Sequence, residues 1–307
     1  MSFSLSSLIG SLPGAVSQGL LWGVMALGVM MSYRILDFSD LTVDSSLCTG
    51  AAVNAVMLAA GLHPLLALAG ATVAGLLAGL MTGLLHTVLD IPPILSGILS
   101  QLALYSINMR ILGRANYPLL GVETLLSLRE PPAAILKGSL AAVLLVLLLN
   151  WFFTTERGYA IRATGSNAGM ARAQGINTAS ATVLTLMLSN ALIGLSGGLI
   201  SQYQGYADVN MGRGAIVIGL ASIILGEALP GLKGRFPLRL VATVLGSILY
   251  YIVITLVLQM GLNTNDLKLL SALVVALALG VPVLRRKSAL KRSIMAGMNQ
   301  PETEENE

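Results

Sequence analysis

The sequence predicts an all-α fold, a polytopic bundle of eight or nine membrane-spanning helices. Hydrophobic residues make up 55% of the 307 residues and charged residues only 10%, whereas about a quarter of the residues in a soluble domain are charged. The mean hydropathy is +0.81. Apolar windows of roughly 18 or more residues recur along the chain, and each is long enough to cross about 30 Å of hydrocarbon.

We predict nine spans, at residues 15–33, 41–60, 64–89, 93–112, 133–154, 179–201, 212–229, 237–260 and 266–284. The second and seventh have the weakest signal. The first span is expected to remain in the mature protein, because the first 33 residues carry no Lys or Arg that would form the charged region of a cleavable signal. Residues 1–12 mix apolar residues with serines, which suits a helix in the outer interface, and a disordered tail is the alternative.

The distribution of the 18 Lys and Arg residues predicts the orientation of the chain. We place the loops after spans 1, 3, 5 and 7 and the C-terminus in the cytoplasm, since most basic residues then lie inside. The cytoplasmic set is Arg34, Arg157, Arg162, Arg172, Lys233, Arg235, Arg239, Arg285, Arg286, Lys287, Lys291 and Arg292, and the outer set is Arg110, Arg114, Arg129, Lys137, Arg213 and Lys268. Because these residues occupy short loops, the net charge of +4 indicates a multi-pass cell-membrane protein and not a nucleic-acid surface.

We divide the chain into a transmembrane domain at 1–284 and a tail at 285–307, which is basic first and acidic last. The tail is expected to anchor the topology and to end in a disordered segment. The outer loop at 113–132 mixes charge with prolines and could rest against an external partner. Spans 3 and 6 carry small residues at helical spacing that allow close helix packing, namely Gly75, Gly79, Gly83, Gly194 and Gly198.

Three carboxylates occur at and after the end of the first span. Asp37, Asp40 and Asp44 have spacings of three and four residues, which would place them near one face of a helix. Asp40 is positioned to cap the second span. Asp44 lies deeper and should face protein or water, because a carboxylate is costly in lipid.

The chemistry of an enzyme is largely missing. The stretch "GLSG" at 194–197 resembles the serine motif of an intramembrane protease, but His63 and His86 precede it, and close helix packing explains it better. No Walker phosphate-binding loop occurs, so ATP would have to be bound by another subunit. The single cysteine, Cys48, excludes an internal disulfide and a multi-cysteine metal site.

A polar segment at 156–177 separates the fifth span from the sixth. Its sequence predicts a helix from Glu156 to Ala163 with Arg157 and Arg162 exposed. A turn follows at 164–167, where Gly165 would supply a positive φ and Asn167 would cap the next helix.

The second short helix is predicted from Ala168 to Gln174 and ends at Gly175. A partner with an apolar cleft could accept the small or apolar side chains of Ala163, Ala168, Met170 and Ala171. The alternative is a solvated loop that only obeys the positive-inside rule.

This segment resembles the coupling-helix signature of permeases in the branched-chain amino acid and ribose superfamily of ATP-binding cassette importers, G-x-x-x-R-A-x-G-x-N-x-x-A-A-x-x-x-G-I. The residues in register are Gly158, Arg162, Ala163, Gly165, Asn167, Ala171, Gly175 and Ile176, with Met170 in place of the first alanine of the pair. Upstream segments, such as "GILSQLALYSINMRILG", resemble the subgroup of tryptophan and tyrosine transport permeases. The likeness covers residues 14–284, and it is more specific for the superfamily than for a substrate.

The resemblance implies a type II importer permease that dimerises with a second copy around a central path. Its coupling helix would dock on a cytoplasmic ATPase that binds ATP and magnesium, and an extracytoplasmic binding protein would deliver the solute. This chain would hold no cofactor and would catalyse nothing. The solute would be an aromatic or other amino acid, with a nucleoside, sugar or vitamin as alternatives. A passive channel or an ion-coupled carrier is the rival interpretation.

Polar residues inside the spans are candidates for the solute path, since a lipid-facing helix avoids them. They are Asp44, Ser45, Ser46, Asn54, Gln101, Tyr105, Asn108 and Asn190. The alternative for each of them is a hydrogen bond between helices.

Overall fold

The computed structural model describes residues 5–128, 130–229, 231, 232, 234–259, 269, 272, 273, 276 and 280. The elements are α1 Leu5–Val29, the π-helical η1 Met30–Ile35, α2 Val43–Ala59, α3 Pro64–Thr87, α4 Pro93–Leu112, β1 Asn116–Pro118, α5 Pro131–Phe153, α6 Glu156–Ser166, α7 Ala168–Ala173, α8 Thr178–Gln204, β2 Tyr206–Asp208, α9 Ala215–Ala228 and α10 Phe236–Gln259. Arg129, Lys233, most of the predicted ninth span and the tail at 285–307 lie outside the described residues.

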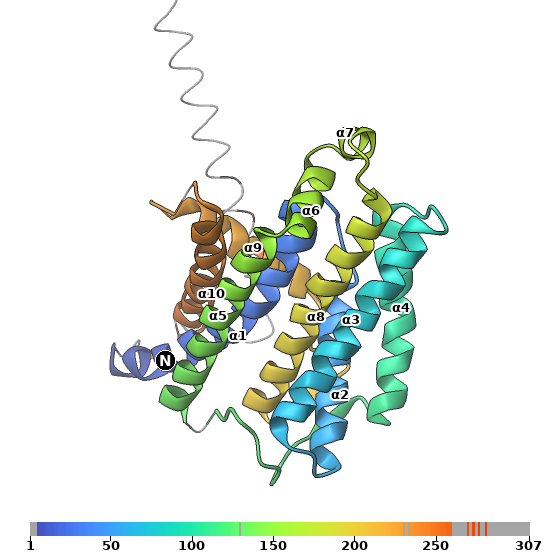
Figure 1. Cartoon of the computed structure of the whole chain (residues 1–307). Helices are drawn as coiled ribbons and strands as arrows, with labels where there is room; N and C mark the ends of the chain where they lie inside the picture. The colour runs from blue at the N-terminus through green and yellow to red at the C-terminus, as the bar shows by residue number, and fades with distance from the viewer. Residues whose placement is uncertain are drawn as a thin grey trace, which may run out of the picture.

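The predicted membrane helix bundle is confirmed (Figure 1). Five described helices are long and apolar enough to cross a membrane, namely Gly10–Ile35, Pro64–Thr87, Pro131–Phe153, Thr178–Gln204 and Phe236–Gln259. The helix α4 covers the predicted residues 93–112. The helix α1 begins at Leu5 and includes Pro13, so a disordered tail is the wrong description of residues 5–12.

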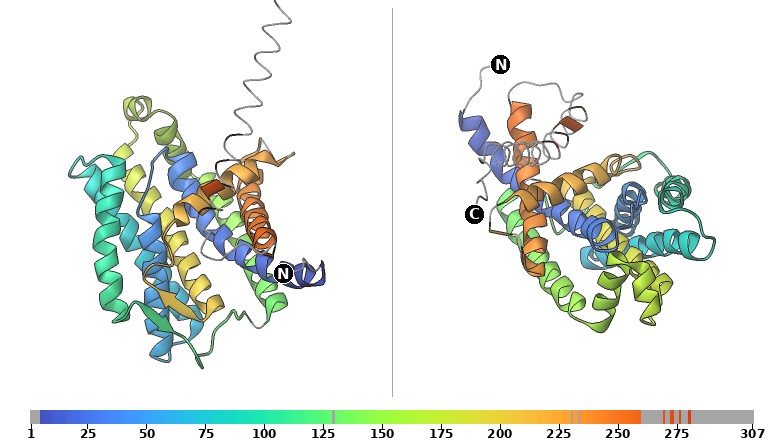
Figure 2. Two further views of the ribbon diagram at one scale, coloured as in Figure 1. Left: turned by 180° about the vertical axis from the view of Figure 1, so that it is seen from behind. Right: turned by 90° about the horizontal axis from the view of Figure 1, so that it is seen from above.

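The two ends of the bundle differ in charge and structure. The end formed by α6 and α7, called the α7 end here, carries most of the described residues that were assigned to the cytoplasm (Figure 1). At the opposite end, β1 pairs with β2 in antiparallel register, with Tyr117 opposite Ala207 (Figure 2). The basic residues on elements at the α7 end, or directly before one, are Arg34, Arg157, Arg162, Arg172, Arg235 and Arg239.

The helix α8 forms the centre of the bundle and packs against α1, α2 and α3. Close contact with α3 requires the absence of side chains, because a β-carbon at Gly75 or Gly79 would overlap the backbone carbonyl of Asn190 or Leu186. This contact confirms the predicted close packing of spans 3 and 6. Ser196 of "GLSG" is buried and donates to the Leu21 carbonyl at 2.8 Å, which confirms its packing interpretation.

The helices α2 and α9 are too short to cross the membrane alone. They have 17 and 14 residues, which at 1.5 Å per residue gives about 25 and 21 Å. Each follows non-helical chain, at 36–42 and 209–214, that enters the bundle. Continuous helices are present at the predicted spans 41–60 and 212–229, but they begin later, at Val43 and Ala215. The predicted common helical face is wrong, because Asp37 and Asp40 lie in the non-helical segment and Asp37 has a φ of 58°.

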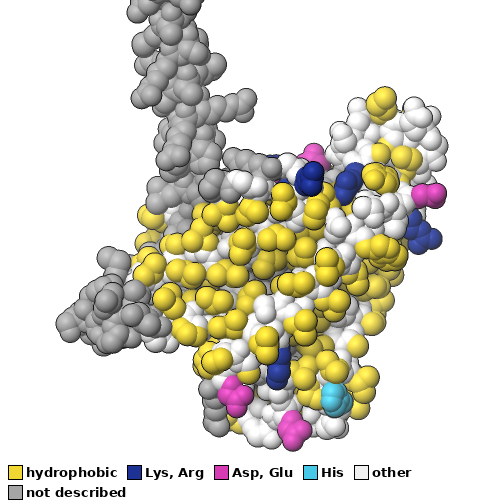
Figure 3. All heavy atoms as spheres, turned by 60° about the vertical axis from the view of Figure 1, so that its left-hand side comes forward, with side chains coloured by type: hydrophobic (Ala, Val, Ile, Leu, Met, Phe, Trp, Pro, Cys, Tyr) yellow, Lys and Arg dark blue, Asp and Glu magenta, His cyan; other side chains and the backbone are white. Residues whose placement is uncertain are grey.

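One broad side of the bundle is apolar. Figure 3 shows this face covered by hydrophobic side chains, with charged groups confined to its edges. The helix α5 supplies exposed residues such as Leu140, Leu144, Leu147 and Trp151, and α10 supplies Val241 and Leu245. Such a surface suits the hydrocarbon core of a bilayer.

Candidate functional site

Local hydrogen bonds build the two short helices at the α7 end. The Thr155 hydroxyl accepts from the Gly158 N–H at 3.3 Å at the start of α6. The Asn167 Oδ1 accepts from the Met170 N–H at 2.9 Å, which confirms Asn167 as the N-cap of α7. Gly175 has a φ of 82° just after α7, as a C-terminal glycine should. The predicted pair of capped helices is confirmed.

Two predictions about this segment are wrong in detail. Gly165 lies within α6 without a positive φ, and its lack of a side chain serves a close approach, because a β-carbon there would overlap the Ile35 carbonyl. Ala171 is 4% exposed, so it packs inward and cannot contact a partner, whereas Met170 is 64% exposed. Ala163 and Ala168 are half-buried. The surface open to a partner is therefore centred on Met170.

Arg162 is half-buried, and its predicted exposure is also wrong. The Arg162 Cζ lies 3.9 Å from the ring centroid of Phe236 on α10 and 5.5 Å from that of Phe153 on α5. Burial lowers the pKa of the Arg162 guanidinium. Gly158 fits under the end of α5, where a β-carbon would lie 2.5 Å from the Phe153 Cα. The helix α6 is thus seated on the ends of α5, η1 and α10.

An ion-pair cluster lies next to this seat. Glu227, on the last turn of α9, accepts from Arg34 Nε at 2.9 Å and from Arg34 Nη2 at 2.8 Å. The Nη2 of Arg239 on α10 lies 3.5 Å from the Glu227 Oε1. One carboxylate therefore joins η1, α9 and α10 at the α7 end.

A cavity of about 350 Å³ opens between α2, α4 and the chain before α9. It brings together Asp44, Ser45, Gln101 and Tyr105 of the predicted path and adds Cys48, Leu102, Val209 and Arg213. The Ser45 hydroxyl donates to the Gln101 carbonyl at 3.0 Å. Since Gln101 lies near the middle of α4, the cavity is at mid-depth of the bundle.

Asp44 binds the first turn of α9. Its carboxylate accepts from the Gly214 N–H at 2.9 Å and from the Ile216 N–H at 3.1 Å. The prediction that Asp44 faces protein or water is confirmed. A carboxylate is stabilised at a helix N-terminus because it satisfies orphan amides and interacts favourably with the helix dipole.

Other predicted path residues lie inside the bundle. Asn54 donates to the Ser201 hydroxyl at 2.9 Å, and Asn190 donates to the Asp40 carboxylate at 2.7 Å. Asn108 donates to the Ser45 carbonyl at 3.3 Å. Asn54, Asn108 and Asn190 thus make the hydrogen bonds between chain segments that were the stated alternative. Ser46 is also buried. Contact between these four residues and a solute stays a prediction.

Asp40 accepts from the Thr42 N–H at 2.9 Å just before α2 begins. This bond stabilises the turn that leads into α2, close to the predicted cap position. The second oxygen of Asp40 accepts from Asn190 and so connects this turn to the middle of α8.

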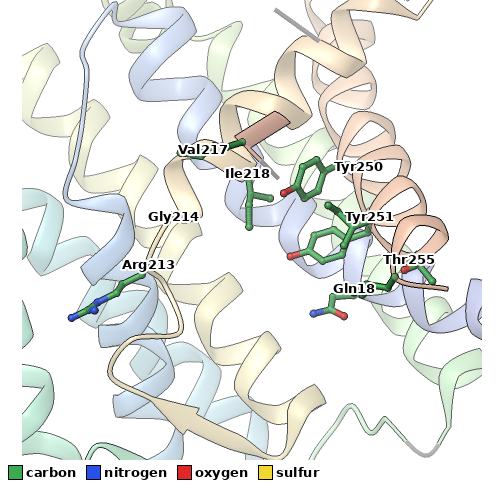
Figure 4. Close-up of a pocket in the computed structure, with 11 residues that line it drawn as sticks. Gln18, Arg213, Gly214, Val217, Ile218, Tyr250, Tyr251 and Thr255 are labelled. Atoms are coloured by element: carbon green, nitrogen blue, oxygen red, sulfur yellow. The ribbon is translucent and has the colours of Figure 1, made fainter. Parts of the chain in front are cut away.

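Sequence reasoning missed Arg213, which it assigned to the outer side. Arg213 lies at mid-depth and borders both the cavity with Asp44 and a second cavity of about 540 Å³ between α1, α9 and α10. In Figure 4, Tyr250 and Tyr251 point toward Ile218 while Arg213 points away from them. Arg213 itself is exposed, and the shortness of the apolar stretch at 215–228 is a signal that could have placed it at this depth.

Known proteins resemble this chain over most of its length. Residues 12–281 match the family described as branched-chain amino acid transport system / permease component. The chain is 41% identical over 261 residues to a tyrosine transport system permease protein of Clostridioides difficile, which covers 85% of this chain and 87% of the relative. It is 28% identical to the galactofuranose transporter permease protein YtfT of Escherichia coli, over 82% of this chain and 74% of the relative. No solved structure matches significantly.

Proposed function

The chain belongs to the family of branched-chain amino acid transport system permease components, and from this premise we propose that it is the membrane subunit of an ATP-driven importer for an aromatic amino acid. Family membership alone does not select the solute, since one relative is named for tyrosine and another for galactofuranose. The higher identity to the tyrosine permease supports the amino acid. The cavity supports it too, because Arg213 and Asp44 offer both charges beside the ring of Tyr105.

The contacts at the two ends of the short helix α9 support a mechanism for coupling. Its last turn holds Glu227, which binds Arg34 and Arg239 next to the seat of α6. Its first turn is bound by Asp44 at the cavity. A displacement of α6 by an ATPase would therefore reach both ends of α9, and rigid helices transmit such shifts between alternative packings.

The proposed assembly has three kinds of component: ATPase, permease and binding protein. Two ATPase subunits bind ATP and magnesium, and each contacts the exposed surface of α7 around Met170. A second copy of this chain completes the central path, and an external binding protein docks at the end that carries β1 and β2. The α7 end and the C-terminus then face the cytoplasm, as the basic residues at that end favour.

Uptake by proteoliposomes tests the proposal. The full complex, prepared with its ATPase and binding protein, should import radiolabelled tyrosine only with ATP, and tryptophan or phenylalanine should compete better than galactose or uridine. The variant Arg213→Gln should lower uptake at least tenfold, because a charge-assisted contact with the solute carboxylate contributes about 1.5–3 kcal/mol. Arg110→Gln, at the outer end of α4 and outside the cavity, is the matched control.

Two results would contradict the proposal. Tyrosine flux through the purified chain without an ATPase would indicate a channel or an ion-coupled carrier. Replacement of residues 162–171 by a flexible linker should abolish complex formation and transport-coupled ATP hydrolysis, and their survival would remove the coupling role from α6 and α7.

A further inference from the structure

The α7 end contains two adjoining cavities that the transport proposal does not use. Their volumes are about 400 and 350 Å³, and both are lined by Arg34, Gly234 and Arg239. Arg162 and Ser166 are among the other residues that line the first cavity, and Glu227 is among those that line the second. Three guanidinium groups therefore surround one connected region.

The positive charge of this region is only partly neutralised. Glu227 makes a bidentate pair with Arg34, at 2.8 and 2.9 Å, but its contact with Arg239 is longer, at 3.5 Å. Arg162 stacks on Phe236 and forms no ion pair with a carboxylate in the part of the chain that the structure describes. One carboxylate thus balances three guanidinium groups.

The arginine groups remain accessible to a ligand. The side chains of Arg34 and Arg239 are 46% and 37% exposed. A guanidinium presents several donors in a planar fork that matches the oxygens of phosphate, and it binds phosphate more specifically than a lysine does. An additional oxyanion could therefore bind to Arg239 and Arg162 without breaking the pair of Arg34 with Glu227.

The region also lies at the edge of the apolar face. Charged side chains occur along the upper margin of this face in Figure 3, above the exposed aliphatic residues of α5 and α10. Arg239 is on the first turns of α10, the same helix that exposes Val241 and Leu245 further along. Phospholipid headgroups lie at this level when the apolar face is in hydrocarbon.

We propose that Arg34, Arg162 and Arg239 form a binding site for a phosphate-class oxyanion beside the seat of α6. The same chemistry is present in an anionic phospholipid headgroup and in soluble phosphates such as inorganic pyrophosphate. The adjacent apolar face favours the headgroup. This site is independent of the solute cavity, which lies at the other end of α9.

Native mass spectrometry of the full chain in detergent tests this site, with phosphatidylglycerol, phosphatidylcholine and inorganic pyrophosphate as separate probes. Phosphatidylglycerol should bind more tightly than phosphatidylcholine. Arg239→Gln should weaken phosphatidylglycerol binding roughly tenfold, the usual effect of losing one charge-assisted hydrogen bond. Glu227→Gln should strengthen binding, because it removes the competing carboxylate. Arg157→Gln, which has the same charge change on α6 but lines another cavity, should change binding less than twofold.

The arms of the experiment separate the two sources. Binding of phosphatidylglycerol alone supports the site as a headgroup site, and arginine-dependent binding of pyrophosphate supports it as a site for soluble phosphate. The proposal is overturned if neither probe binds, or if Arg239→Gln and Arg157→Gln have equal effects. If Arg239→Gln does not fold, Glu227→Gln decides: tighter binding supports the site and unchanged binding overturns it.

Discussion

Replacing Asp44 with alanine removes the carboxylate that binds the first turn of α9. The side chain accepts two backbone hydrogen bonds, from Gly214 and Ile216, at 2.9 and 3.1 Å. Gly214 is the N-cap residue of α9, and Ile216 lies in its first turn. The variant therefore leaves two amide groups without their acceptor at mid-depth of the bundle.

The magnitude follows from these two bonds. A hydrogen bond to a charged acceptor contributes about 1.5–3 kcal/mol, and loss of an N-cap costs about 0.5–2 kcal/mol. Asp44 borders an open cavity, so water can replace part of the interaction. We expect Asp44→Ala to lower the free energy of unfolding by about 2–4 kcal/mol. Asp44→Asn keeps one acceptor oxygen but loses the charge, and should cost about half as much.

Equilibrium unfolding in mixed micelles, followed by tryptophan fluorescence, measures these values, because Trp22 is buried against Tyr251 on α10. Asp208→Ala is the matched control. Its carboxylate accepts from the Asn210 N–H at 2.7 Å and from Asn116 Nδ2 at 3.3 Å, but both bonds are exposed, so the loss should stay within about 1 kcal/mol. If Asp44→Ala is no more destabilising than Asp208→Ala, the cap does not hold α9 and the mechanical link to the cavity fails.

Two further predictions concern the seat of α6. Gly165→Ala should destabilise the chain by about 1–3 kcal/mol and reduce stimulation of the ATPase, because its β-carbon would overlap the Ile35 carbonyl. Gly14→Ala, where a β-carbon would meet no atom closer than 4.0 Å, should leave both measurements nearly unchanged, and equal effects would refute the close-contact argument. A double-mutant cycle of Arg162→Ala and Phe236→Ala, read by chemical unfolding, should give a coupling energy of about 0.5–2 kcal/mol from the cation–π contact, and additive effects would show that this contact does not join α6 to α10.

The long helices were predictable from sequence because the thickness of hydrocarbon sets the length of an apolar run. The helix α4 has the predicted bounds, and α3, α5, α8 and α10 differ from theirs by a few residues at most. The capping residues of α7 were equally predictable from the sequence. Asn167 and Gly175 act on amides and carbonyls within a few residues of their own positions, so their roles follow from local sequence.

The candidate site was only partly predictable. Asp44, Ser45, Gln101 and Tyr105 were identified as polar residues in apolar spans, and they converge on one cavity. Arg213 was missed, because its depth depends on how far the segment before α9 enters the bundle. Gly165 was identified for the wrong reason, since its contact with Ile35 joins residues far apart in the chain.

The sequence by itself was enough to identify this protein as a multi-pass permease, and it indicated which polar segment to propose as the coupling element. Hydropathy and capping are local properties, so a window of neighbouring residues contains the information. The tertiary structure decided which polar groups face a cavity and which tie helices together. Asp44 and Gly214 are 170 residues apart, and the acceptor that an orphan helix amide finds depends on the packing of the whole bundle.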